Sequence, residues 1–160
     1  MDLFFEQNLT HNAALASHLI SVAVRECYEQ NDRKSGGQFP AAFSILPLVF
    51  HKNTAESFAN KKRPGILFKA LSDNREIPLG LQERMEGYAD LTLASLNLAI
   101  TLDLVYLDIN GTFEIVPGKV SKMNFIHPYI KTAINAAKRV GQTLSELSIE
   151  QLCIYLNIRF

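Results

Sequence analysis

The sequence of 160 residues has no tryptophan, only two cysteines and no net charge. Cys27 and Cys153 lie far apart, and we expect both to be small buried apolar residues in a reducing compartment. A disulfide between them is the less favoured alternative. Because acidic and basic residues balance, the whole chain has no electrostatic attraction to nucleic acid or to a membrane surface.

Targeting and membrane-spanning segments are also lacking. No apolar run reaches the roughly 18 uncharged residues that are needed to cross a bilayer. The chain begins Met1-Asp2-Leu3-Phe4-Phe5-Glu6, with acids where a secretory signal would be basic. We therefore predict a cytoplasmic protein that makes no membrane contact.

The sequence lacks the common nucleotide-binding and nucleophile motifs. A phosphate-binding loop ends in Gly-Lys followed by Ser or Thr, with another glycine five residues before the Gly-Lys pair. Here Gly118-Lys119 is followed by Val120, and Phe113 occupies the position of the first glycine. There is no Gly-x-Ser-x-Gly sequence either. We therefore expect no nucleotide site of this type and no serine nucleophile.

Metal ligands and paired acids are equally scarce. The four histidines have neither Cys pairs nor a His-Glu-x-x-His spacing beside them, so we predict no metal and no cofactor. They are His11, His18, His51 and His127. Three acids on adjacent helical turns form a candidate acid/base set: Glu83, Glu86 and Asp90. Solvated acids are much commoner on helices, so we predict that the protein is not an enzyme.

One stretch, Leu79 to Pro117, organises the predicted fold. Asn110-Gly111 between alternating apolar residues predicts a β-hairpin with a two-residue type I′ turn. Before it, residues 91–107 fit either a strand period or a widely buried helix. A strand of that length would be unusual, so we predict one helix from about 79 to about 103, followed by a strand.

The rest of the chain reads as helices. We predict a helix from Ala13 to about Gln30 capped by Asn8 or Asn12, and a buried helix bent by Pro47. Short helices follow near residues 53–60 and 65–72. A late helix begins at His127-Pro128 and ends at Gly141 as a C-cap, and Ser148 caps the last helix.

This pattern predicts a mainly α fold with a small β-hairpin, similar to a winged-helix domain. We assign residues 1–160 to one domain, with a helical part over about 8–103. The hairpin wing covers about 104–117 and the C-terminal helices about 127–157.

Charge is unevenly distributed along the chain. Between Glu76 and Glu114 there are seven acids and one base, Arg84. A basic region without any acid follows, made up of Lys119, Lys122, Lys131, Lys138 and Arg139. Solvated faces are the common explanation for such clusters. The alternative is a protein with two binding faces, in which these bases contact nucleic acid or an acidic partner.

Three segments resemble a known family. Phe39 to Thr54 (FPAAFSILPLVFHKNT) is similar to a segment of the middle component of ABC-type three-component systems. Towards the end, Val140-Gly141-Gln142 resembles a Leu-Gly-Arg motif of that family, and Cys153 to Arg159 resembles its closing pattern. Gln142 replaces a usual Arg and Asn157 a usual Gly. The order and spacing match from about Asn12 to Phe160.

The resemblance implies a small, non-catalytic subunit between an SMC/Rad50-like ATPase and an effector or receptor. Such systems, Lamassu-type among them, are bacterial anti-phage or anti-plasmid modules, in which DNA would be reached only through the complex. The alternative from the hairpin alone is a winged-helix DNA-binding regulator. Such regulators usually have a basic wing, whereas no Lys or Arg lies between Val105 and Pro117.

We also predict a partner interface from two apolar segments. Pro47 interrupts a buried helix, and the apolar tail has no chain after it to cover it. The alternative is that both segments are ordinary core. The candidate interface residues are Leu46, Pro47, Leu48, Val49, Phe50, His51, Ile158, Arg159 and Phe160.

Overall fold

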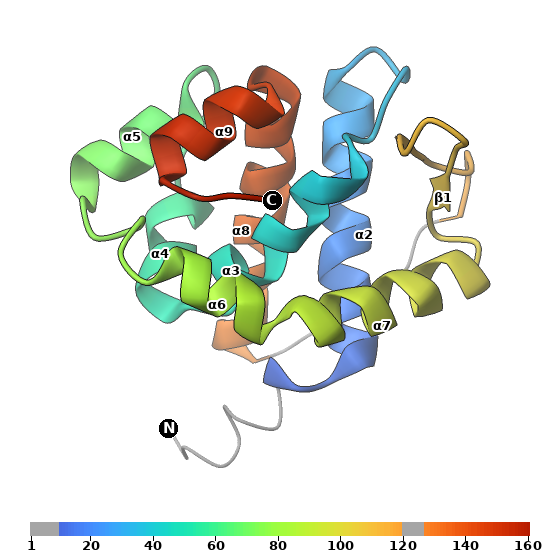
Figure 1. The fold of residues 1–160 in the computed structure, drawn as a ribbon, viewed down its shortest axis with the longest axis horizontal. Coiled ribbons are helices and arrows are strands. Elements are labelled where there is room, and N and C mark those ends of the chain that lie inside the picture. Colours follow the sequence, from blue (N-terminus) through green and yellow to red (C-terminus); the bar gives the residue numbers. More distant parts are fainter. Residues whose placement is uncertain (1–9, 120–126) are drawn as a thin grey trace.

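The computed structural model describes residues 10–119 and 127–160, which are mostly helical (Figure 1). The long helices are α2 (Ala13–Gln30), α7 (Ala89–Thr101) and α8 (Pro128–Glu146). The shorter elements are the 3₁₀ helix η1 (Phe39–Ser44), α3 (Ile45–Val49), α4 (Lys52–Ala59), α5 (Ile66–Asp73), α6 (Leu81–Gly87) and α9 (Ile149–Leu156). A two-stranded antiparallel hairpin consists of β1 (Tyr106–Leu107) and β2 (Phe113–Glu114). The predicted mainly α fold with a small hairpin is confirmed.

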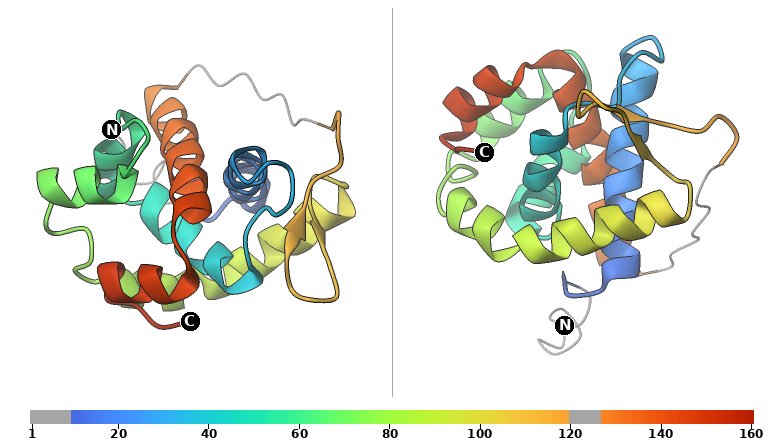
Figure 2. Two further views of the ribbon diagram at one scale, coloured as in Figure 1. Left: turned by 90° about the horizontal axis from the view of Figure 1, so that it is seen from above. Right: turned by 45° about the vertical axis from the view of Figure 1, so that its right-hand side comes forward.

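Helix α2 lies at the centre of the structure, packed against α8, α7 and α3 (Figure 2). It begins where predicted, because the Asn12 side chain accepts hydrogen bonds from the amides of Ala14 and Leu15. Its buried face provides Leu19, Ile20 and other core residues. No helix in the described part of the chain is both long and apolar enough to cross a membrane.

Helix α8 begins as predicted, with Pro128 in its first turn and His127 as its N-cap. The predicted C-cap at Gly141 is wrong, because α8 continues to Glu146. A Cβ atom on Gly141 would lie 2.1 Å from the carbonyl oxygen of Ala23. This glycine therefore allows the backbones of α2 and α8 to approach closely.

The single helix predicted over 79–103 is two helices, α6 and α7, which meet at Tyr88. Gly87 is the last residue of α6. Glycine has a low helix propensity, and nothing lies within 4 Å of the place that a Cβ atom would take here. The buried, bent helix predicted around Pro47 is instead η1 followed by α3, with Pro40 in the first turn of η1. Helix α4 begins at Lys52 after His51, rather than after a cap at Asn53 or Thr54.

The hairpin has a longer turn than predicted. Asn110 does not take the positive φ that a type I′ turn requires, whereas Gly111 has a φ of +76°. Asp108 accounts for the difference, because its carboxylate accepts hydrogen bonds from the amides of Asn110 and Thr112, each 2.8 Å long. The turn is thus stabilised by an aspartate side chain.

A third segment, residues 36–39, pairs with the free edge of β2. The Gly36 amide donates to the Phe113 carbonyl, and the Phe113 amide donates to the Gly37 carbonyl. The side chain of Phe113 is buried against the core. The hairpin is therefore fixed to the helical body, and the sequence pattern alone gave no sign of this third segment.

Candidate protein interfaces

The predicted interface segment Leu46–Phe50 lies in the core. All five of its side chains are buried, and even Phe50 is only 5 % exposed. The Phe50 ring packs on Tyr88 with 5.7 Å between centroids, and the Tyr129 hydroxyl donates to the Phe50 carbonyl. The alternative of ordinary core therefore describes this segment, and these side chains offer no surface to a partner. His51, the next residue, is exposed.

The C-terminal tail is docked on its own chain. Ile158 is only 3 % exposed, and its amide donates to the Cys153 carbonyl. The amide of Arg159 donates to the side-chain oxygen of Gln82 on α6 at 2.8 Å. Asn157 takes the left-handed conformation, with a φ of +52°. The family resemblance leads us to expect glycine at this position. Asparagine tolerates this conformation better than most residues, so the replacement preserves the turn.

The end of the tail borders an open groove of about 390 Å³. Its other walls are mostly apolar and come from η1 and α6, including Phe39, Phe43 and Met85. Phe160 is 43 % exposed and Arg159 is exposed, so both are accessible at this groove. Contact of Arg159, Phe160 and His51 with a partner stays a prediction.

The predicted basic residues do not form one patch within the described part of the chain. Lys119 pairs with Asp103 at 2.8 Å, and Lys122 lies outside the described residues. Arg139 donates to Gln142, which in turn donates to Glu26 on α2. That leaves two exposed bases on α8 that have no ion pair within residues 10–119 and 127–160: Lys131 and Lys138.

The titratable groups singled out in the sequence lie in different environments. No group of three or more His, Cys, Asp or Glu in residues 10–119 and 127–160 could hold a metal ion. Glu83, Glu86 and Asp90 are all exposed to solvent. Cys27 is buried, as predicted, and burial raises the pKa of its thiol to about 12, so this residue stays protonated. Both cysteines are free, and the predicted burial of Cys153 is wrong, because this residue is only half-buried.

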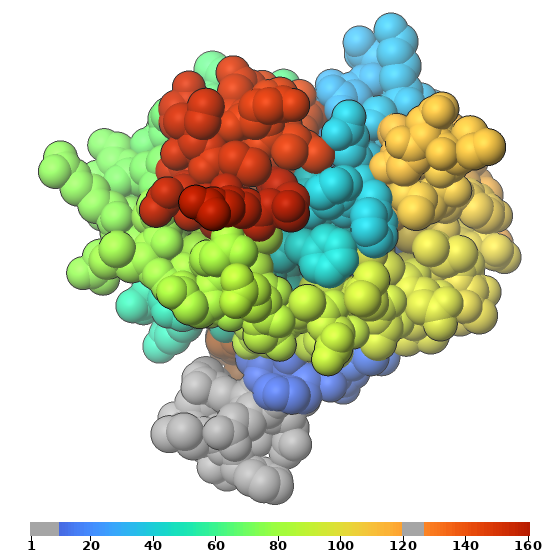
Figure 3. Space-filling model, viewed as in Figure 1, coloured from blue at the N-terminus to red at the C-terminus, as the bar shows by residue number. Residues whose placement is uncertain are grey.

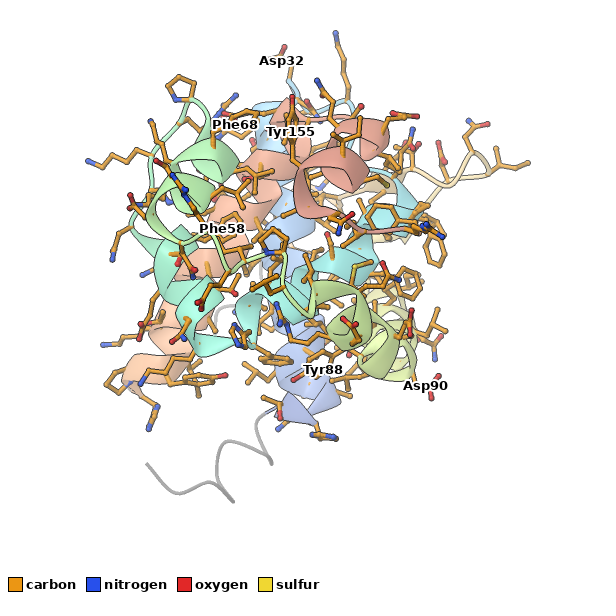
Figure 4. The ribbon with its side chains drawn as sticks, turned by 60° about the vertical axis from the view of Figure 1, so that its left-hand side comes forward. Asp32, Phe58, Phe68, Tyr88, Asp90 and Tyr155 are labelled. Carbon is orange, nitrogen blue, oxygen red and sulfur yellow. The ribbon has the colours of Figure 1, made fainter. Side chains whose placement is uncertain are left out.

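Sequence reasoning missed two exposed apolar surfaces. The first, the α7–hairpin surface, comprises Leu93, Ile100, Leu102, Tyr106, Leu107 and Ile109. The second, the α5–α9 surface, comprises Phe68, Ile154 and Tyr155, with the two rings edge to face at 4.9 Å. Figure 4 shows Phe68 and Tyr155 together on the outside of α5 and α9. A helix pattern predicts which residues can be apolar on a face, but the neighbouring elements decide which of them stay uncovered.

The two surfaces lie at opposite ends of the long axis of the described structure, with α5 at one end and the hairpin at the other (Figure 1). Exposed apolar patches of this kind on a folded chain commonly mark sites of contact with other proteins. The geometry therefore fits a protein that is contacted from two sides.

Comparison with protein families matches residues 3–160 to the ABC-three component (ABC-3C) system Middle Component 3 family. The chain belongs to this family. The resemblance to a middle component of a three-component system is thus confirmed, and a middle component has partner subunits. No curated protein and no solved structure matched the chain. The Lamassu-type assignment, the SMC/Rad50-like ATPase and the likeness to a winged helix stay predictions.

Proposed function

We propose that this middle component is a non-catalytic adaptor that links an SMC/Rad50-like ATPase to an effector subunit. The complex would act in the cytoplasm of a bacterium against phage or plasmid DNA, as in Lamassu-type systems. The observation that carries the proposal is the pair of exposed apolar surfaces at opposite ends of an ABC-3C middle component. One surface for each partner is the simplest way for a small chain to connect two subunits.

The alternative, a DNA-binding regulator, is disfavoured by the helix that precedes the hairpin. In a winged-helix reader, this helix and the wing approach the DNA phosphates, which requires basic side chains. From Ala89 to Val116 the chain has no Lys or Arg but has four acids, Asp90, Asp103, Asp108 and Glu114. Phosphates would therefore be repelled from this face.

Co-expression with the neighbouring subunits tests the proposal. The chain would be produced together with the ATPase and the third protein that are encoded beside it, and each pair would be purified through a tag on this chain. We expect two separate binary complexes and one ternary complex, with no ATP hydrolysis by this chain alone. A chain that binds neither subunit, or that hydrolyses ATP without them, would contradict the proposal.

A further inference from the structure

In the α7–hairpin surface, the hairpin lies beside the end of α7, as Figure 3 shows. The Leu104 amide donates to the Ala99 carbonyl, which joins the connecting loop to α7. The Tyr106 hydroxyl lies 3.4 Å from the Asp103 carboxylate, and Lys119 pairs with the same residue. These contacts hold the hairpin beside the helix. Leu93 and Ile100, seven residues apart, extend the apolar row along α7.

The tip of this surface presents an uncovered apolar side chain on a rigid support. Ile109 is 100 % exposed, although it stands in a turn that Asp108 holds by two hydrogen bonds. Below the tip, β2 is paired on both edges, and Phe113 anchors it in the core. A partner that covers Ile109 would lose little conformational entropy, because the backbone is already ordered.

The charge of the surface indicates the chemistry of that partner. Tyr106 lies directly opposite Glu114 across the two strands, so their side chains share one face. Neither Glu114 nor Asp90 has an ion pair within the described residues, whereas Asp103 is already paired with Lys119. A guanidinium or ammonium group placed against Tyr106 and Glu114 would gain both a cation–π contact and an ion pair.

We propose that the α7–hairpin surface binds a basic and apolar segment of a partner subunit. An aliphatic or aromatic side chain of that segment packs on Ile109 at the tip of the hairpin, and a neighbouring Lys or Arg lies against Tyr106 and Glu114 on its outer face. Leu107 lies on the other face of the hairpin, opposite the buried Phe113. The inference rests on the proposed adaptor function, because the partner is another subunit of the same system. The four acids and absent bases of residues 89–116 disfavour a nucleic acid as the occupant.

A second copy of the chain is the competing occupant, because it presents an exposed base beside an exposed ring at Phe68-Lys69 and at Arg159-Phe160. The adaptor function favours a neighbouring subunit instead, and a measurement of the oligomeric state distinguishes the two occupants.

The test measures the affinity of the full-length chain for each of the two subunits encoded beside it, in the wild type and in two variants. We expect Ile109→Ser to weaken binding to one subunit about tenfold, and Glu114→Lys to weaken it by more than that. The matched controls, Leu79→Ser before α6 and Glu56→Lys on α4, lie outside both surfaces and should leave that affinity unchanged. Melting temperatures should be equal in all five proteins, because each changed side chain is exposed.

The outcomes separate the inference from the function on which it rests. If the wild type assembles and both variants bind as tightly as it does, the inference is overturned and the adaptor function stands. If the wild type binds neither subunit, the adaptor function fails first. If Ile109→Ser instead abolishes a dimer of this chain in light scattering, the surface is a self-association site and the inference is wrong.

Discussion

Gly141 shows how much a single residue determines in this fold. It lies inside α8, where glycine is unfavourable for the helix, yet its backbone contacts that of Ala23 on α2. The closeness of α2 and α8 sets the position of every element packed on either helix. The sequence motif around Gly141 therefore reflects packing rather than the end of a helix.

We expect Gly141→Ala to lower the free energy of unfolding by about 3 kcal/mol, near the upper end of the usual cost of overpacking. The new methyl group would overlap the Ala23 carbonyl, which is backbone and cannot rotate away. Gly87→Ala is the matched control, because nothing lies within 4 Å of its Cβ position. That change should be neutral or stabilise by up to about 1 kcal/mol in urea unfolding. Equal effects of the two substitutions would contradict this account.

His18 makes stability depend on pH. It is buried in α2, and burial lowers its pKa below the ordinary value of 6.5. Below pH 6.5 the His18 side chain therefore binds a proton more tightly in the unfolded chain than in the folded chain, which favours unfolding. The stabilisation is fully present above pH 6.5, decreases as the pH falls below it, and levels off below the folded-state pKa.

We expect the melting temperature of the wild type to decrease between pH 7.5 and pH 5, and His18→Gln to show a smaller decrease. His51→Gln is the useful comparison, because the pKa of His51 is also lowered, mainly by the partial desolvation of this otherwise exposed residue and further by the nearby Arg84 charge. The two substitutions should reduce the pH dependence separately. An unchanged pH profile in His18→Gln would show that the group does not titrate as described.

At the scale of elements, the predictable features were those encoded by adjacent residues. Asn12 and Ser148 cap the helices where they were expected to, because a cap needs only a side chain and the amides that follow it. The break at Tyr88 and the pairing of residues 36–39 with β2 were missed. The pairing depends on residues about 75 positions away, which local periodicity does not register.

The candidate site was less predictable than the fold for the same reason. The Leu46–Phe50 segment and the tail are both apolar, and the sequence could not show which neighbours cover them. In the folded chain α3 is enclosed by α2, α6 and α8, whereas Ile109 at the hairpin tip is left uncovered. The exposure of an apolar residue is set by tertiary packing, and that is where the sequence interpretation failed.

The tail separates into a core residue and an accessible one. We expect Ile158→Ala to destabilise the chain by about 2–4 kcal/mol, because it removes a fully packed side chain. Phe160→Ala should cost less than about 1 kcal/mol, since that ring is 43 % exposed. Chemical denaturation of both variants measures the difference. A large loss of stability in Phe160→Ala would show that the groove-lining ring is structural.

Deleting Ile158 to Phe160 combines both effects and removes the hydrogen bonds between Arg159 and Gln82. A truncated chain should therefore have a clearly lower melting temperature. Phe160→Ala, which keeps Ile158 in place, is the variant that reports on partner binding at the groove without this loss.

At the scale of the whole molecule, acids and bases occupy different stretches of the chain, and the exposed bases without an ion pair in the described residues come from several separate elements. The Lys61-Lys62-Arg63 run is partly neutralised, because Lys61 pairs with Asp73 and Arg63 with Glu146. The exposed Lys131 and Lys138 on α8 could meet only a small number of phosphates. We therefore predict that this chain reaches DNA only through another subunit.

We therefore expect the isolated chain to bind duplex DNA weakly, with a Kd above about 1 µM at 150 mM salt. Each phosphate neutralised contributes about −0.9 to the slope of log K against log salt, so two to four contacts give a slope of about −2 to −4. Fluorescence anisotropy with a 30-bp duplex between 50 and 200 mM salt measures both quantities. Lys131→Gln combined with Lys138→Gln should make the slope shallower by about 2, whereas Lys34→Gln, at an exposed position outside α8, should leave it unchanged. Nanomolar, sequence-specific binding with a slope steeper than about −5 would support the regulator instead of the adaptor.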